Sequence, residues 1–267
     1  MSQDLRPVLA GWDFDPDRVQ VRIIVGDDGA EKIQMRVDLG VMQMESDGRP
    51  DGERPEGYES MLEYYETAAA SDENFRLGPP ECAILMREGL QYYHRYLSAF
   101  HLERFDWVAR DTARNLRLFA FVVKHAVRQR DRIEFDRYRP YVTMMHHRAL
   151  ASRFLADDNH RAAIEAVDDG IAAIRRFLAD YGQEDHEGEC GELQFLLQWR
   201  QELERERPVG PIERLEQQLE VSVKLENYEE AARIRDQIRR LREGESRRLG
   251  TAGPSTGPGG DPSLRKP

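Results

Sequence analysis

The chain has 267 residues, of which 40% are hydrophobic and 33% charged, and its formal net charge is −11. This composition suffices for a folded core and is typical of a helix-rich protein with much solvated surface. It argues against a membrane protein, because no apolar run approaches the roughly 20 residues that a bilayer span requires. The N-terminus also lacks the basic-then-apolar pattern of a signal peptide, so we expect a cytoplasmic protein.

The N-terminal part alternates apolar and polar residues in two runs, residues 19–25 and 33–41, on either side of Gly26-Asp27-Asp28-Gly29. This pattern predicts a small antiparallel β-hairpin with one apolar face. Two strands alone are marginal in water, so the hairpin must cover helices or another chain. Residues 45–55 are rich in glycine, proline and charge and predict a surface loop, which gives a first segment over residues 1–57.

Residues 58–207 have helical periodicity almost throughout, and we predict helices over 58–70, 81–101, 105–130, 140–156, 161–181 and 189–207. The sequences that follow three of the predicted turns are similar. In each, polar residues are followed one helical turn later by a small residue, namely Ala109, Ala163 or Ala231. This resembles the second-helix region of tetratricopeptide repeats, although those alanines are 54 and 68 residues apart and true repeats recur every 34 or so. We predict a mainly α fold, a tetratricopeptide-like array of helical hairpins, with a plain helical bundle as the alternative.

Basic residues are concentrated in the middle of the chain. Residues 87–153 carry 14 basic and 7 acidic side chains, whereas residues 1–86 carry 8 and 19. Within this belt, Arg110, Arg114 and Arg117 have the spacing of one helix face, and arginine with aromatic side chains is the mixture that nucleic-acid grooves use. The alternative, which we favour because the whole chain is acidic, is that the N-terminal segment packs on the belt and neutralises it.

Motifs for catalysis are lacking in the sequence, which has no GxxxxGK[ST], no GxGxxG after a strand and no HExxH. Cys82 and Cys190 have no nearby cysteine, so no disulfide framework or CxxC site is indicated. A metal site near His186 and Cys190 is disfavoured, as is a hydrolase site among His146, His147 and Asp157. We therefore expect no enzyme activity, no cofactor and no metal.

The C-terminal part begins with a break at Pro208-Val209-Gly210-Pro211, which predicts a hinge over residues 208–211. Two amphipathic runs follow, separated by Glu226-Asn227-Tyr228, and they predict a helical hairpin over residues 212–243. Acidic residues open its second arm and arginines close it, as the helix dipole favours. Residues 244–267 are rich in Gly, Pro, Ser and Thr and predict a disordered tail.

This hairpin resembles the UVR motif, a short helical hairpin of the excision-repair subunits UvrB and UvrC, some Clp-type ATPases and activators of protein arginine kinases. The matching text is Leu215-x3-Leu219, then LExYExAAxIRDxIxxL from Leu225 to Leu241. It departs from the family at Ser222-Val223, where a small pair is usual, and at Tyr228, where phenylalanine is more frequent. The resemblance implies a docking element that pairs with another helical hairpin and has no chemistry of its own.

We therefore predict a non-enzymatic adaptor that binds a protein partner, or a second copy of itself, through this UVR-like hairpin. The predicted partner-binding residues are Leu215, Leu219, Val223, Tyr228, Ala231, Ala232, Ile234, Arg235, Asp236, Ile238 and Leu241. The alternative is a nucleic-acid-associated repair accessory that uses Arg110, Arg114 and Arg117. Neither hypothesis involves a membrane.

Overall fold

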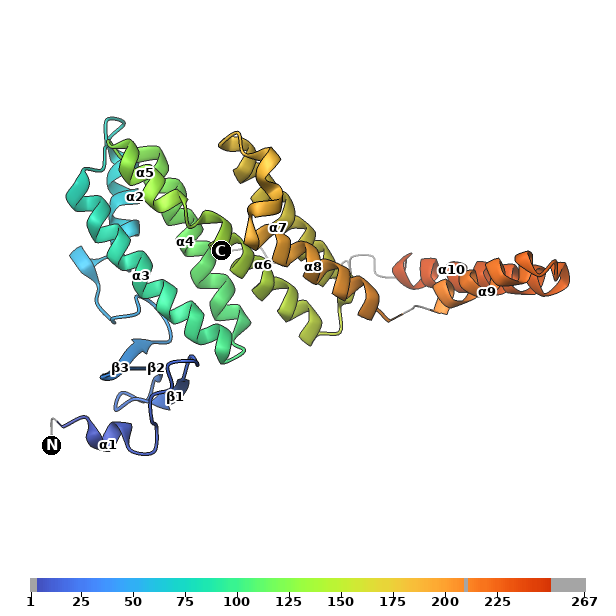
Figure 1. The fold of residues 1–267 in the computed structure, drawn as a ribbon, viewed down its shortest axis with the longest axis horizontal. Coiled ribbons are helices and arrows are strands. Elements are labelled where there is room, and N and C mark those ends of the chain that lie inside the picture. The colour runs from blue at the N-terminus through green and yellow to red at the C-terminus, as the bar shows by residue number, and fades with distance from the viewer. Residues whose placement is uncertain (1–3, 209–210, 251–267) are drawn as a thin grey trace, which may run out of the picture. The chain divides into compact units, whose positions relative to one another are not determined.

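The structure, a computed structural model, describes residues 4–208 and 211–250 (Figure 1). The described residues form two compact units, one that ends at Glu206 and one that begins at Arg207. We call them the N-terminal unit and the hairpin unit. The predicted hinge includes residues 209 and 210, which lie outside the described residues, and so do residues 251–267 of the predicted tail.

The N-terminal unit is mainly helical, as predicted, and carries one small antiparallel sheet. Its helices are α1 (Arg6–Leu9), α2 (Met61–Ser71), α3 (Pro79–His101), α4 (Phe105–His125), α5 (Gln129–Asp136), α6 (Arg139–Ala156), α7 (His160–Asp180) and α8 (Gly191–Glu206), with short 3-10 turns at Pro55–Gly57 and Glu184–Glu189. The larger helices pack as consecutive antiparallel neighbours (Figure 1). They enclose two hydrophobic clusters, one centred on α6, α7 and α8 and one on α2, α3, α4 and α5.

The sheet has three strands in the order β1 (Val21–Val25), β2 (Glu31–Val37) and β3 (Gly40–Glu45), whereas we predicted two. The run predicted as one strand over residues 33–41 is divided between β2 and β3, because the chain reverses at Asp38-Leu39 and brings Gly40 opposite Val37. Leu39, which we had placed on the apolar face, is 90% exposed in this turn. Ile33 on the central strand is fully buried.

The helix predicted over residues 105–130 is also divided, into α4 and α5. At the end of α4, the Leu77 amide donates to the carbonyl of His125 (2.9 Å) and the Val127 amide donates to the carbonyl of Leu77 (3.0 Å). This short parallel pairing with the segment before α3 draws residues 126–128 out of the helix. The division follows from a long-range contact, which helical periodicity does not reveal.

The turns that join paired helices share one geometry, which explains the similar text that follows them. In each turn one residue has positive φ, namely Glu103 (55°), Asp158 (55°) and Glu226 (56°). The next amide donates back to the carbonyl five residues earlier: Arg104 to Ala99, Asn159 to Phe154 and Asn227 to Ser222, at 2.8–2.9 Å. This is the Schellman arrangement that ends a helix. The tetratricopeptide-like character of the array stays a prediction.

Counting from these positive-φ residues also refines the small-residue pattern. The fifth residue is Val108, Ala163 or Ala231, and all three are buried. Ala109, which we had grouped with Ala163 and Ala231, is therefore one position later than its counterparts. Close packing is nevertheless a feature of this array: a Cβ added to Gly170 of α7 would lie 2.8 Å from His147 and 3.0 Å from Leu196.

Candidate functional site

The hairpin unit contains α9 (Pro211–Lys224) and α10 (Tyr228–Gly250). The side chain of Asn227 caps α10, because its Oδ1 accepts from the amide of Glu230 at 3.3 Å. Glu229 and Glu230 follow in the first turn, where the positive end of the helix dipole favours acidic side chains. The helix continues to Gly250, past the end predicted at residue 243, since a single glycine such as Gly244 costs a helix only about 1 kcal/mol.

The turn offers a direct test of its geometry. Glu226→Gly should stabilise the hairpin unit by about 0.5–1 kcal/mol, because glycine adopts positive φ without a Cβ penalty. Glu226→Ala keeps the Cβ and should give none of this gain, which separates the backbone effect from loss of the carboxylate. The measurement is hydrogen exchange of α9 and α10 amides in the full chain. Equal protection in both variants would contradict the positive-φ assignment.

The contact between α9 and α10 is a narrow apolar seam. Ala231, Ile234 and Ile238 of α10 are buried in it at 8%, 4% and 6% exposure. Among residues 214–224 of α9, the partly buried side chains are Leu215, Leu219 and Ser222. Ser222 rather than Val223 continues this row. Each helical residue turns the side-chain direction by about 100°, so Ser222, seven residues after Leu215, points within about 20° of the Leu215 direction. Val223, eight residues after Leu215, points about 80° away from it.

Most of the other predicted partner-binding residues lie outside the seam. Val223 is 50% exposed, Tyr228 68% and Leu241 41%, and Ala232 and Arg235 are also exposed. Asp236 accepts a hydrogen bond from Arg239 of its own helix at 3.0 Å. The structure therefore divides the predicted set into a buried seam and an exposed remainder, and whether either binds a partner stays a prediction.

Two exposed apolar residues of the hairpin unit were not among the predicted partner-binding residues. Val221 is 56% exposed and Leu225 is 74% exposed. Leu225 follows the last residue of α9, and its amide still donates to the Val221 carbonyl at 3.0 Å, so both side chains lie on the same side of the helix. Val221 lines a groove of ≈ 440 Å³ together with Gln217, Ser222 and Ile234. The sequence could have indicated this exposure, because both apolar residues fall outside the row of seam residues that starts at Leu215.

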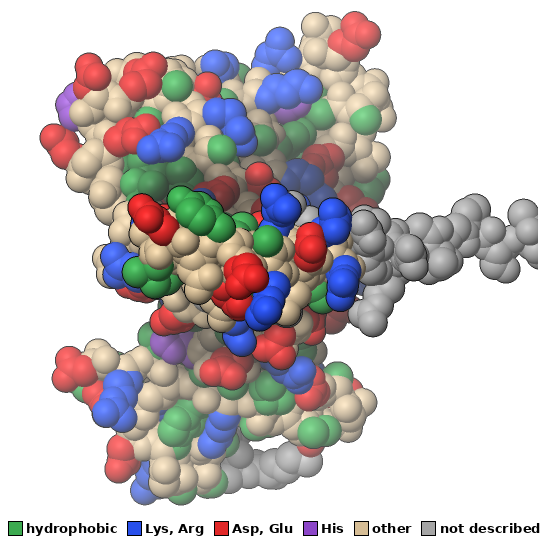
Figure 2. Space-filling view, turned by 90° about the vertical axis from the view of Figure 1, so that its right-hand side faces the viewer, with side chains coloured by type: hydrophobic (Ala, Val, Ile, Leu, Met, Phe, Trp, Pro, Cys, Tyr) green, Lys and Arg blue, Asp and Glu red, His purple; other side chains and the backbone are tan. Residues whose placement is uncertain are grey.

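The three arginines proposed for nucleic acid do not form one exposed strip. Arg114 is nine-tenths buried and pairs with Glu88, Arg110 donates to Asp47 at 3.0 Å, and Arg117 pairs with Glu66 at 3.1 Å. The carboxylates come from α2, α3 and the loop after β3, which is the neutralised arrangement that we favoured. Acidic and basic side chains are also interspersed on the face of the molecule shown in Figure 2.

The N-terminal unit also contains a buried charged cluster that sequence reasoning missed. Arg95 and Asp111, each 1% exposed, form two hydrogen bonds of 2.7 and 2.8 Å. Glu88, also 1% exposed, accepts from the amides of Met61 (2.8 Å) and Leu62 (3.1 Å) at the start of α2. Arg95 further donates to the carbonyl of Glu45 at 3.1 Å. The cluster therefore ties the sheet and α2 to the α3–α4 pair.

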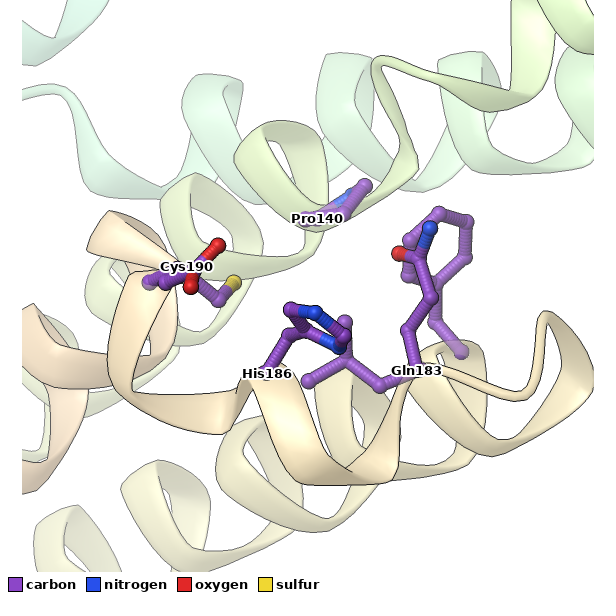
Figure 3. A pocket seen from close by; sticks show the side chains of 7 residues that line it. Pro140, Gln183, His186 and Cys190 are labelled. Carbon is purple, nitrogen blue, oxygen red and sulfur yellow. The ribbon is translucent and has the colours of Figure 1, made fainter.

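The His and Cys candidates do not converge on a catalytic or metal centre. His186 and Cys190 line one pocket with Pro140 and Gln183 (Figure 3), and burial raises the pKa of the Cys190 thiol. Within the described residues, no group of three or more His, Cys, Asp and Glu side chains is placed to hold a metal ion.

The paired histidines of α6 serve packing contacts instead. His146 Nδ1 lies 3.0 Å from the Thr112 hydroxyl, and His147 Nδ1 lies 2.7 Å from the Ala166 carbonyl. Burial lowers the pKa of both imidazoles. Asp157 lies after the last residue of the same helix and forms no hydrogen bond with either ring, so these three residues do not assemble the considered hydrolase site.

Comparison with known families assigns the hairpin unit. Residues 211–244 match the family model described as the UvrB/uvrC motif, which confirms the predicted UVR motif. No curated protein and no solved structure matches the chain. Across residues 4–208 and 211–250, no helix has the length and apolar character of a membrane span. The matched motif is known in protein-interaction and DNA-repair contexts.

Proposed function

We propose that the protein is a non-enzymatic adaptor that binds a protein partner through the hairpin unit, and that the partner contributes its own helical hairpin. The observation that carries this proposal is that several large apolar side chains are exposed on this small unit. They are Val221, Val223, Leu225, Tyr228 and Leu241. Exposed apolar surface of this kind, surrounded by charged side chains, is typical of interaction sites.

The exposed residues favour docking beside the seam rather than in it. Val221 and Val223 are two positions apart, so they point to nearly opposite sides of α9. The side of α9 with Val221 carries the groove that reaches Ile234, and Leu225 lies one turn further along that side. An apolar helix of the partner can pack there without opening the contact between α9 and α10, since Ile234 and Ile238 already fill that contact.

Val221→Asp combined with Leu225→Asp should therefore abolish partner binding, or self-association if the partner is a second copy, while the hairpin stays folded. Both side chains are exposed, so their replacement adds no buried charge. Sedimentation velocity of the purified chain measures self-association. A pull-down followed by reconstitution with the purified captured partner measures hetero-association.

The matched control is Leu39→Asp, which alters an equally apolar side chain that is 90% exposed in the N-terminal unit. It should leave association unchanged. Binding that survives the Val221 and Leu225 pair at full affinity would contradict docking on this side of the hairpin unit. Affinity for single-stranded DNA that falls steeply with salt, in place of protein binding, would favour the nucleic-acid alternative.

A further inference from the structure

A second candidate binding site lies in the N-terminal unit, far from the exposed apolar residues along the sequence. A cavity of ≈ 660 Å³ opens among α3, α4, α5 and α6, helices that lie together in Figure 1. Four tyrosines line it: Tyr93, Tyr96, Tyr138 and Tyr141. We call it the tyrosine pocket. Its volume is in the usual range of ligand sites, and no part of the proposed adaptor function uses it.

The tyrosine rings support one another. The ring of Tyr93 meets Tyr96 edge-on with centroids 5.5 Å apart and lies 6.4 Å from the ring of Tyr141. At the mouth of the tyrosine pocket, Leu90 of α3 and Tyr138, which precedes α6, are exposed, so the apolar surface continues beyond the cavity. A ligand that extends past the pocket would therefore remain in contact with apolar surface.

The polar groups of the pocket show what the ligand must supply. Tyr96 is 1% exposed, and none of the described residues forms a hydrogen bond with its hydroxyl group. Burial raises the pKa of Tyr96, with smaller contributions from Tyr141 and Tyr93, so the phenol stays a protonated donor. Asn115 is already engaged, since its Nδ2 donates to the Gly89 carbonyl at 3.0 Å and its Oδ1 accepts from Arg114.

An extended peptide meets this requirement better than a helix does. The carbonyl groups of a helix are used within the helix, whereas those of a polyproline II segment are free to accept from tyrosine hydroxyls. Proline rings also pack well against aromatic side chains, which is how aromatic-lined grooves recognise proline-rich segments.

Charge at the rim indicates a basic peptide. Arg137 pairs with Glu134 at 3.5 Å and lies over the Tyr138 ring, so that pair is nearly neutral. Glu192 of α8 also lines the tyrosine pocket and is only partly exposed. Within the described chain its carboxylate has no cationic partner and accepts only from the Cys190 thiol, at 3.6 Å. A basic side chain on the ligand would provide the missing partner.

We propose that the tyrosine pocket binds an extended, proline-rich segment of a partner protein, with a basic residue of that segment paired to Glu192. The prolines pack on Tyr93, Tyr138 and Tyr141, and a backbone carbonyl accepts from Tyr96. The pocket would give the protein a second interaction surface, independent of the hairpin unit.

The test uses the full chain and a synthetic array of proline-rich peptides that carry Arg, Gln or Glu at one central position. Arginine peptides should bind most tightly. Tyr96→Phe should weaken their binding about fivefold without lowering the unfolding midpoint, because the lost hydroxyl has no partner inside the protein. Glu192→Gln should remove the preference for Arg over Gln and leave binding of the Gln peptides unchanged.

The matched control is Tyr65→Phe, which removes a hydroxyl from a buried tyrosine of α2 outside the tyrosine pocket and should not change affinity. The proposal is overturned if no peptide of the array binds, if glutamate peptides bind best, or if Tyr96→Phe binds as tightly as the unmodified chain. Competition by free arginine amide at peptide-like concentrations would show a small-cation site and would also overturn it.

Discussion

Asp111→Ala should destabilise the N-terminal unit by about 3–5 kcal/mol, because it leaves a buried guanidinium without its carboxylate. Arg95 is 1% exposed, and after the change it keeps only its hydrogen bond to the Glu45 carbonyl. Arg110, which also donates to Asp111 at 3.0 Å, loses the same partner. Urea denaturation followed by circular dichroism measures the loss.

Two further variants show whether burial causes this effect. Arg104→Ala removes a surface ion pair with Glu31, in which both side chains are well exposed. It should lower the free energy of unfolding by less than about 1 kcal/mol. Arg95→Met combined with Asp111→Leu replaces the buried pair with apolar groups and should recover most of the stability lost in Asp111→Ala. Similar costs for Asp111→Ala and Arg104→Ala would refute the buried pairing.

The parts of the fold that the sequence predicted are those that depend on neighbours along the chain. The UVR motif was recognisable because Leu225, Ala231, Ile234 and Ile238 lie within a few helical turns of one another. Val223 lies off the seam although it continues the same pattern, because two successive four-residue steps drift away from the seam. A helical projection would have placed Ser222 in the row.

The parts that were missed depend on which helices pack together. Arg95 and Asp111 are on different helices, and nothing in their local text distinguishes them from solvated charges. The arginines at 110, 114 and 117 share a helix face, as predicted, but each of them pairs with an acidic residue of α2, α3 or the loop after β3. The tyrosine pocket likewise requires the placement of four helices.

Ile238→Asp should unfold the hairpin unit and leave the N-terminal unit intact. Ile238 is 6% exposed between α9 and α10, and an unpaired buried charge costs several kcal/mol. A unit of about 40 residues holds only about 2–6 kcal/mol of stability at 0.05–0.15 kcal/mol per residue. The hydrophobic clusters of the N-terminal unit contain no residue beyond Leu203, so they do not depend on this side chain. Partner binding should be lost together with the fold of the hairpin.

Hydrogen exchange separates the two causes of lost binding. In Ile238→Asp, amides of α9 and α10 should lose protection while those of α3, α4, α6 and α7 keep it. In Val221→Asp with Leu225→Asp, binding should be lost with protection retained throughout, because both side chains are exposed. Retained protection of α10 in Ile238→Asp would show that this residue is not in the seam. Retained binding by an unprotected hairpin would instead place the docking surface elsewhere in the chain.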